Sequence, residues 1–510
     1  MALENRTLNA SRNIIWGSIS KIVLMLLPFF IRTIFIYTIG LEYLGLNSLF
    51  TSILQMLSLA ELGFGTAVVY SLYKPLANND TDTVCAIIAF LKRTYRYVGL
   101  LILVLGSILS FLLPKLIHGE VPKDINIYYI YFLYLINTVI SYFFAGYKSA
   151  LLTANQRDDV KSKVITLTSI GQYLLQGIAL WVFRNYYAYI VILPLTTLMV
   201  NIINAYLTKK YFPQYIAKGK LPKEQMLPMT KQICGLLISR IAGVSRNAVA
   251  NVMISSSIGL VALAIYSNYT YIVTSLHGLL TIVGSSIVAG VGNSIVKETE
   301  QKNHQDFMNF NFMYMWVSGW LFCCFLNLLQ PFITLWVGAE STMSFTTVIL
   351  LCFMFYFTAA GDMRNTYVNA TGIWWQNKWR SIFETVVNIL LGFILIKRFQ
   401  IAGVLSSIIV STVVVNLWYG STILYTEYFK NHKFSVFILS HLQYLLATIL
   451  VTAVTYVCCN YISDNTWGTF LVKIIICVIV PNALYILIYH RRSEFQSFKN
   501  LAKRILKKQL

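Results

Sequence analysis

Apolar stretches that are long enough to cross a membrane recur along the whole chain, and they constrain its fold more than any other feature. Of the 510 residues, 57% are hydrophobic and only 12% are charged. A helix of about 17–25 apolar residues crosses ~30 Å of hydrocarbon, and in lipid only helices and closed barrels satisfy the backbone. The apolar runs are continuous rather than alternating, which excludes a barrel. The chain is therefore predicted to be an all-α, polytopic membrane protein.

We predict fourteen membrane spans from the apolar runs. They lie near residues 13–37, 44–73, 84–113, 125–153, 162–183, 186–208, 230–256, 260–290, 307–337, 343–370, 380–397, 402–428, 436–462 and 468–490. No cleavable signal peptide is expected, because the first run follows a short polar start and continues as an ordinary span. An even number of spans puts both termini on one side. Only five basic residues fall on the other side, namely Lys115, Lys123, Arg184, Lys397 and Arg398. The positive-inside rule therefore predicts that both termini are cytoplasmic.

Seven basic side chains lie inside the predicted spans: Lys21, Arg32, Lys148, Arg240, Arg246, Arg364 and Lys473. A Lys or Arg at mid-bilayer depth costs about 2.5–3.5 kcal/mol even on the lenient insertion scale. A fold that keeps several of them is expected to use them. The simplest use is a water-filled cavity that receives an anionic cargo.

The first span carries the clearest pattern of this kind. Lys21, Pro28 and Arg32 are spaced by seven and four residues, so they fall on one helical face. Proline bends a helix, which suits a cavity wall that moves, and Pro28 is our candidate for a gating kink. The alternative for Arg32 is that it snorkels to the outer headgroups.

The other candidates differ in depth. Arg240 is central in its span, and Arg246 lies about 120° around the same helix, where it either flanks the cavity or pairs with a carboxylate. Lys148 and Arg364 lie near the inner ends of their spans, so snorkelling to the cytoplasmic headgroups is an equal alternative, and Lys473 is read as snorkelling. The candidate cavity residues are thus Lys21, Arg32, Arg240, Arg364, Arg246 and Lys148.

Three carboxylates also lie in the predicted spans, namely Glu61, Asp362 and Glu384. Each either balances one of the basic residues or takes up a proton or cation during transport. Asp362 and Arg364 are two residues apart on one helix and do not face each other, so each needs another partner.

A weak internal repeat suggests two lobes. Gly40–Leu44 matches Gly259–Leu263 at an offset of 219 residues, which also maps Lys21 onto Arg240, and an offset of 216 maps Lys148 onto Arg364. Six spans per repeat make the repeats parallel. We therefore predict two six-helix lobes around a central cavity plus two extra C-terminal helices. The predicted parts are an N-terminal lobe (1–210), a basic cytoplasmic interlobe loop (211–228), a C-terminal lobe (229–430), spans 13 and 14 (431–490) and a basic amphipathic tail (491–510).

No catalytic constellation is present in the sequence. It lacks a phosphate-binding loop, a HExxH motif and a nucleophile elbow, and its eight cysteines show no ligand spacing. We expect no enzyme activity, no cofactor and no metal. The net charge of +21 is distributed as a membrane protein distributes it, so no nucleic-acid partner is expected.

One stretch of the chain resembles a known family. Gly40–Ala77, GLEYLGLNSLFTSILQMLSLAELGFGTAVVYSLYKPLA, resembles the opening of Wzx-type polysaccharide flippases, as do Asn9–Asn13 and Leu152–Gln156. These flippases belong to the multidrug/oligosaccharidyl-lipid/polysaccharide exporter superfamily. Many of them have twelve spans, whereas fourteen resembles the branch that flips the peptidoglycan precursor. No functional residue is carried over from the family.

The resemblance implies a function. The cargo would be an oligosaccharide on polyprenyl pyrophosphate, turned from the inner to the outer leaflet of the bacterial cytoplasmic membrane for capsule, exopolysaccharide or O-antigen synthesis. Membrane lipids, a polymerase and a chain-length regulator of the same pathway would be its partners. Two alternatives stay open: a MATE-like drug or cation antiporter, whose cavity should be acidic, and a non-transporting scaffold of a glycan-assembly complex.

Overall fold

The computed structural model describes a helical protein. It describes residues 2–58, 61–119, 121–144, 146–222, 243–244, 246–462, 464–497 and 499–500, and these residues contain no strand. The chain divides into two compact units, residues 1–264 and 265–510. Arg240 and residues 501–510 of the basic tail lie outside the described residues.

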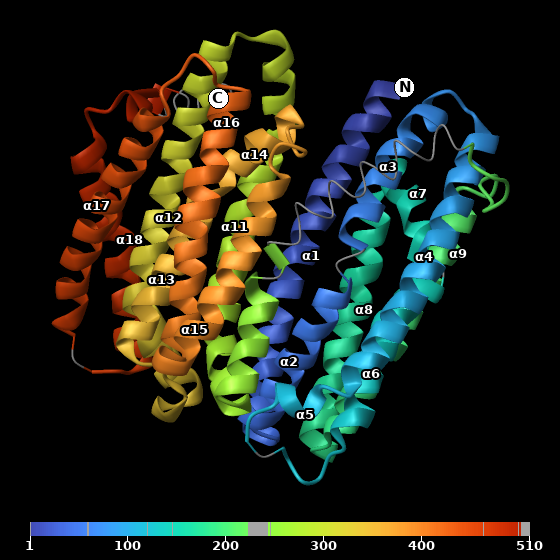
Figure 1. Cartoon of the computed structure of the whole chain (residues 1–510), viewed down its shortest axis with the longest axis horizontal. Coiled ribbons are helices and arrows are strands. Elements are labelled where there is room, and N and C mark those ends of the chain that lie inside the picture. The colour runs from blue at the N-terminus through green and yellow to red at the C-terminus, as the bar shows by residue number, and fades with distance from the viewer. Residues whose placement is uncertain are drawn as a thin grey trace. The chain divides into compact units, whose positions relative to one another are not determined.

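The first unit contains several long helices and several short ones (Figure 1). They are α1 (Ala2–Thr38), α2 (Leu41–Leu57), α3 (Glu61–Ala77), α4 (Thr81–Ser110), α5 (Leu113–Leu116), α6 (Ile127–Phe143), η2 (Gly146–Lys148), α7 (Ser149–Ala154), α8 (Asp158–Ile178), η3 (Ala179–Phe183) and α9 (Tyr186–Tyr211). Helix α8 packs between α1 and α9, and α6 packs against α4 and α9. Asn126 and Asn185 cap α6 and α9, because their side-chain oxygens accept hydrogen bonds from the first free backbone N–H groups.

The second unit is built around the long helix α12. Its helices are α11 (Leu260–Lys297), whose first turn belongs to the first unit, α12 (Glu300–Val337), η4 (Ala339–Ser341), α13 (Phe345–Ala360), α14 (Asp362–Thr371), α15 (Lys378–Ser411), η5 (Thr412–Tyr419), α16 (Gly420–Glu427), α17 (Phe434–Asn460) and α18 (Trp467–Tyr489). Helix α12 contacts α13, α17 and α18, and α13 contacts α15. The spans predicted at 436–462 and 468–490 are α17 and α18, so they pack directly on α12.

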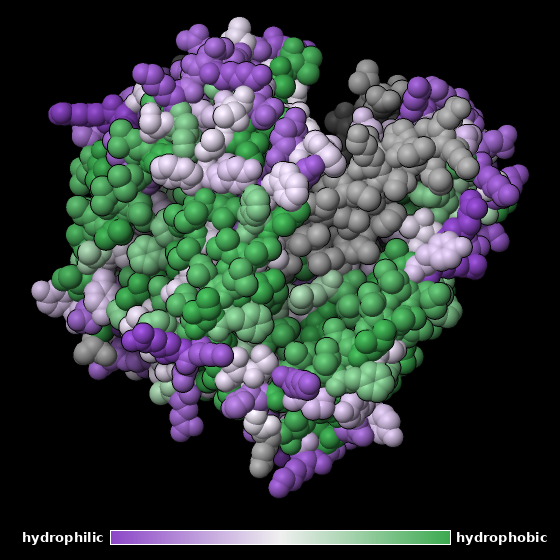
Figure 2. Space-filling view, viewed as in Figure 1, coloured by the Kyte–Doolittle hydropathy of each residue, from purple (hydrophilic) through white to green (hydrophobic). Residues whose placement is uncertain are grey.

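On the face shown in Figure 2, hydrophobic residues cover the middle of the helices and hydrophilic residues gather at their two ends. On α17 and α18 the exposed side chains include Leu439, Leu442, Leu446, Leu450, Leu471, Ile475 and Ile479. Among the described residues, eight helices are long and apolar enough to cross a membrane, or nine with the bent pair α6 and η2–α7. The chain is therefore a multi-pass membrane protein, as predicted, and the count of fourteen spans stays a prediction.

Several predicted spans are interrupted helices. The run 44–73 consists of α2 and α3, and α6 meets η2–α7 at an angle of 48°. The runs 380–397 and 402–428 are joined at Gln400, whose positive φ of 51° turns the chain back on itself. The two arms then touch, because the Ser407 hydroxyl donates to Asn388 Oδ1 at 3.0 Å.

One structural correspondence supports the internal repeat. Gly40 and Gly259 have φ values of 103° and 125°, and each immediately precedes a helix. In both cases the glycine N–H donates to the carbonyl five residues earlier, Phe35 or Ile254, and those two positions are also 219 apart. Only glycine adopts such φ values without strain, which explains why the residue recurs. The lobe boundaries themselves stay predictions, since the compact units divide after Ala264.

The two shorter stretches behind the family resemblance meet in space. The Asn13 side chain donates to the Gln156 carbonyl at 3.0 Å and accepts from the Asp159 N–H at 2.7 Å. One asparagine of α1 thereby fixes the turn that begins α8.

Candidate functional site

The basic residues of the first unit lie at different depths. Lys21 and Arg32 lie on α1, with the Lys21 side chain exposed and the Arg32 side chain half-buried within electrostatic range of Tyr189 on α9. Pro28 lies inside the same helix. Lys148 ends η2 and Arg246 lies in a described helical segment, and both are half-buried. The structure thus keeps Lys21, Pro28 and Arg32 on one helix, as their spacing requires.

Two other predicted site residues, Arg240 and Glu61, lie in or directly beside segments that the structure does not describe. Arg240 belongs to the segment outside the described residues, so its place in a cavity stays a prediction. Glu61 is the first residue of α3, directly after residues 59–60, which the structure does not describe.

Lys473 of α18 lines a small cavity of about 280 Å³ together with α12 and α17. Asn327 and Gln330 from α12 and Asn460 from α17 line it as well. Lys473 therefore lies among amide side chains, a more polar setting than an apolar run suggests.

Arg364 is fully buried, with an exposed fraction of 0%. It lies on α14, and its guanidinium donates to the backbone carbonyl and to the side-chain oxygen of Asn416 and, at 2.6 Å, to Asn365 Oδ1. Asn416 is part of η5, a π-helical segment. Such wide turns rearrange the backbone hydrogen bonds, and they are frequent at functional sites. The structure places Arg364 inside the protein rather than at a water-filled surface.

Asn416 connects Arg364 to a buried ion pair. Its amide donates to both carboxylate oxygens of Glu384 at 3.1 Å, and Arg380 Nη1 donates to Glu384 Oε2 at 2.8 Å. Arg380 also donates to Asn377 and Ser381, at 3.1 and 3.0 Å. We call Arg364, Arg380, Glu384 and Asn416 the Asn416 network. It holds two basic side chains and one acidic side chain, so Glu384 is the counter-charge that the two arginines share.

A glycine makes room for this network. A Cβ atom at Gly420 would overlap with the Arg364 guanidinium and lie 2.6 Å from Arg380 Cδ. Both arginines therefore pass directly over the backbone of α16, and any side chain at this position would displace them.

Asp362 belongs to a second polar cluster, two residues from Arg364. Its Oδ2 lies 2.7 Å from His277 Nε2 of α11 and accepts a 2.6 Å hydrogen bond from the Tyr314 hydroxyl of α12. We call His277, Tyr314 and Asp362 the Asp362 site. The side chains of His277 and Asp362 are each 20% exposed, so this site is less buried than the Asn416 network.

The sequence analysis missed four of these residues. Arg380 precedes Glu384 by four residues, a spacing at which helical side chains meet, so that pair was readable. His277 and Tyr314 lie 85 and 48 residues from Asp362, and only the packing of three helices brings them together. Asn416 carries no charge and gives no signal in an apolar run.

Comparison with solved structures defines the class of the protein. The chain is similar to an inward-facing MATE-family multidrug resistance transporter of the MOP superfamily, with a TM-score of 0.63 and 15% identity over 81% of this chain and 99% of that chain. It is also similar to the lipid II flippase MurJ in an inward closed conformation, with a TM-score of 0.63 and 15% identity over 94% of this chain and 98% of that chain. An outward-facing MATE transporter matches with a TM-score of 0.56 and 14% identity over 81% of this chain and 95% of that chain. The chain therefore shares the fold of these transporters.

The family follows from the sequence itself. The profile described as "Polysaccharide biosynthesis protein" matches residues 10–289, more than half of the chain. The chain belongs to this family. No curated protein matches it. The membership confirms the resemblance that Gly40–Ala77 indicated.

Proposed function

We propose that this protein is a flippase that turns a polyprenyl-pyrophosphate-linked oligosaccharide from the inner to the outer leaflet of the bacterial cytoplasmic membrane. Family membership links it to polysaccharide biosynthesis, and its fold is shared with a lipid II flippase. The observation that carries the proposal is the excess of basic over acidic side chains in its apolar helices, of which Lys21 and Arg32 on α1 are two examples. Pyrophosphate carries charge that hydrocarbon rejects, and arginine and lysine bind phosphate.

The mechanism is alternating access. The phosphates bind the cationic cavity, the sugars pass through water, and the polyprenyl chain stays in lipid. Lys21 and Arg32, together with Arg240, the counterpart of Lys21 in the other repeat, and Arg246 of the same predicted span, bind the phosphates. Pro28 provides the bend that lets α1 move. Both termini are cytoplasmic, and a polymerase and a chain-length regulator use the product.

The two paired carboxylates have different roles in this proposal. Glu384 balances buried arginines, whereas Asp362 takes up a proton that is coupled to transport. Protonation of Asp362 removes its attraction to His277, and α11, α12 and α14 are all joined at that carboxylate. The titratable groups that face it are His277 and Tyr314.

A MATE-like cation antiporter is the second candidate, because MATE transporters are among the similar structures and Asp362 offers an acidic site. The basic residues of α1 disfavour it, since they repel organic cations.

Complementation of a flippase-deficient strain tests the proposal. The protein should restore surface glycan. Lys21→Glu, Arg32→Glu and Arg240→Glu should not restore it, Arg240→Ala should be inactive, and Arg240→Lys should be partly active because the charge survives but the bidentate fork does not. Lys123→Glu, in an exposed loop, is the matched control. If well-expressed Lys21→Glu and Arg240→Glu both restore normal glycan, the cationic-cavity mechanism is wrong.

A further inference from the structure

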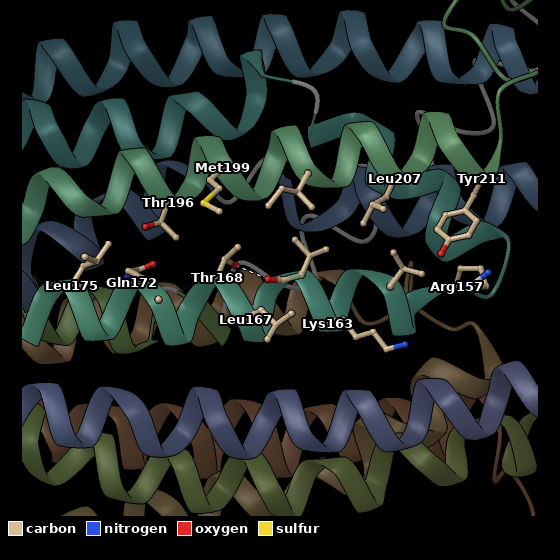
Figure 3. A pocket seen from close by; sticks show the side chains of 14 residues that line it. Arg157, Lys163, Leu167, Thr168, Gln172, Leu175, Thr196, Met199, Leu207 and Tyr211 are labelled. Carbon is tan, nitrogen blue, oxygen red and sulfur yellow. Dashed lines mark hydrogen bonds between the residues drawn. The ribbon is translucent and has the colours of Figure 1, made fainter.

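A groove of about 670 Å³ runs between α8 and α9 of the first unit (Figure 3). Its walls are apolar and face outward: Leu167 and Leu175 of α8 and Met199 of α9 are 68%, 56% and 55% exposed. Its volume lies in the range of small-molecule binding sites. The groove does not contain any residue of the Asn416 network or the Asp362 site.

The threonine hydroxyls in the groove are turned back into their own helices, and the Gln172 amide donates to Gln176 Oε1 at 3.3 Å. Thr168 donates to the Val164 carbonyl at 2.6 Å, and Thr196 donates to the Ile192 carbonyl at 2.8 Å. Because these donors are satisfied, the threonines offer no free hydroxyl donor to a ligand in the groove. The groove therefore suits a hydrocarbon chain better than a sugar.

One end of the groove is cationic. Arg157 donates to Asp159 at 2.9 Å and lies 4.7 Å from the centre of the Tyr211 ring, while Lys163 Nζ lies 3.7 Å from the same carboxylate and 4.9 Å from the centre of the Trp16 ring. Asp159 raises the pKa of Arg157, so this cation is permanent. Two cations share one anion, and Lys209 and Lys210 lie in the last turn of α9 at the same end. This end therefore attracts an anion.

The length of the groove selects among anionic lipids. From Lys163, where the cationic end stops, to Leu175 the α8 axis rises by about 18 Å, since each helical residue adds 1.5 Å. The whole hydrocarbon core is ~30 Å thick, so a phospholipid acyl chain, which spans one leaflet of about 15 Å, would fall short of the far end of the groove. A chain that fills the groove from its cationic end must be longer than one leaflet.

We propose that this groove binds the polyprenyl chain of the lipid-linked cargo, with its phosphates at Arg157 and Lys163. The proposal rests on the flippase function and adds to it a second binding region for the lipid part of the same substrate. The positive-inside rule predicts that the cationic end lies on the cytoplasmic side, where the cargo is made. The groove would thus hold the cargo lipid against the first unit before its headgroup enters the cavity.

Photocrosslinking of the purified full-length protein in nanodiscs tests this. The probe is a polyprenyl phosphate with a photoreactive group at the far end of its chain. It should label peptides of α8 and α9, and Leu167→Trp and Met199→Trp, which fill the groove, should reduce labelling by about tenfold, a 1.4 kcal/mol change. Leu174→Trp and Leu195→Trp are the matched controls, because these residues are 64% and 61% exposed on the same helices but do not line the groove.

The cationic end has its own test. Lys163→Gln should weaken labelling by the phosphate probe but leave labelling by the uncharged polyprenol unchanged. If an excess of phosphatidylglycerol displaces the phosphate probe as well as unlabelled polyprenyl phosphate does, the occupant is an ordinary phospholipid and the inference is overturned. Equal labelling of the groove variants and the controls would overturn it too.

Transport separates this inference from the proposed function. If the wild-type protein restores surface glycan but the groove variants bind the probe normally, only the inference fails. If the wild type binds polyprenyl phosphate in the groove but moves no lipid-linked sugar, the inference stands and the flippase function fails.

Discussion

The Asn416 network and the Asp362 site begin two residues apart on α14, yet they are built differently. Arg364 is 0% exposed, and in the Arg380–Glu384 pair the side chains are only 6% and 3% exposed. His277 and Asp362 are each 20% exposed. Removing one partner of a buried, hydrogen-bonded ion pair leaves the other charge uncompensated, which strongly destabilises the protein. A partly exposed carboxylate, in contrast, exchanges protons with water. We propose from this comparison that the exposure of an ionisable residue inside the membrane decides whether it acts as a structural tie or as a switch.

The largest expected effect is a loss of stability when the Asn416 network loses its carboxylate. Glu384→Gln removes the anion between Arg364 and Arg380 and should destabilise the protein by about 3–5 kcal/mol, since two buried guanidinium groups lose their counterion. Thermal unfolding of the detergent-solubilised protein measures it, with Glu427→Gln, an exposed residue of α16, as control. An unchanged melting temperature for Glu384→Gln would contradict a structural role for the Asn416 network.

The buried pair should also be partly replaceable by apolar residues. Changing Arg380 and Glu384 to Met together should be less destabilising than Glu384→Met alone, because well-packed apolar residues often replace a buried ion pair at little cost. Melting temperatures of the two variants decide this. A double variant that is less stable than Glu384→Met would show that Arg380 has a role beyond pairing.

The Asp362 site should respond in transport rather than in folding. Asp362→Asn should reduce transport by about tenfold or more and abolish its response to pH, because the carboxylate that takes up the coupled proton is gone. Its melting temperature should stay close to that of the wild type. Asp306→Asn, which removes a surface ion pair with Lys302, is the control. A pH response that survives in Asp362→Asn would place proton coupling elsewhere.

The smallest effect concerns one hydrogen bond. Tyr314→Phe removes the hydroxyl that donates to Asp362 and should destabilise the protein by about 1 kcal/mol while the His277 contact remains. Tyr461→Phe is the control, because Tyr461 is 86% exposed. Thermal unfolding of both variants checks the difference. A loss of stability as large as that of Glu384→Gln would mean that the two clusters are structurally alike.

The sequence predicted the architecture better than the site, and the reason is physical. Apolar runs of membrane length read directly as helices, because lipid demands them. The pairing of His277 with Asp362 depends on the rotation and depth of three separate helices, which one sequence does not encode locally. Arg380 reads as a flanking cytoplasmic charge because it stands near the start of its span, and only its spacing to Glu384 points to the pair.

Two backbone features of the Asn416 network, the π-helical turn and the glycine, could not be predicted for a related reason. The π-helical turn at Thr412–Tyr419 exposes the Asn416 carbonyl to Arg364, and nothing in an apolar run marks such a turn. Gly420 is informative only once two arginines are known to cross it. Gly40 and Gly259, in contrast, were matched from the sequence by their similar flanking residues, and their positive φ values explain why both are glycine.

The most direct test of the account is transbilayer movement in proteoliposomes that contain only this protein. Polyprenyl-pyrophosphate-linked oligosaccharide is placed in both leaflets, and a membrane-impermeant glycosidase removes the sugar that it can reach from outside. The account predicts that the inner-leaflet fraction becomes accessible with the wild-type protein and stays protected with Lys21→Glu. If the wild-type protein leaves that fraction protected but exchanges an organic cation for protons, the chain is an antiporter and the account is contradicted.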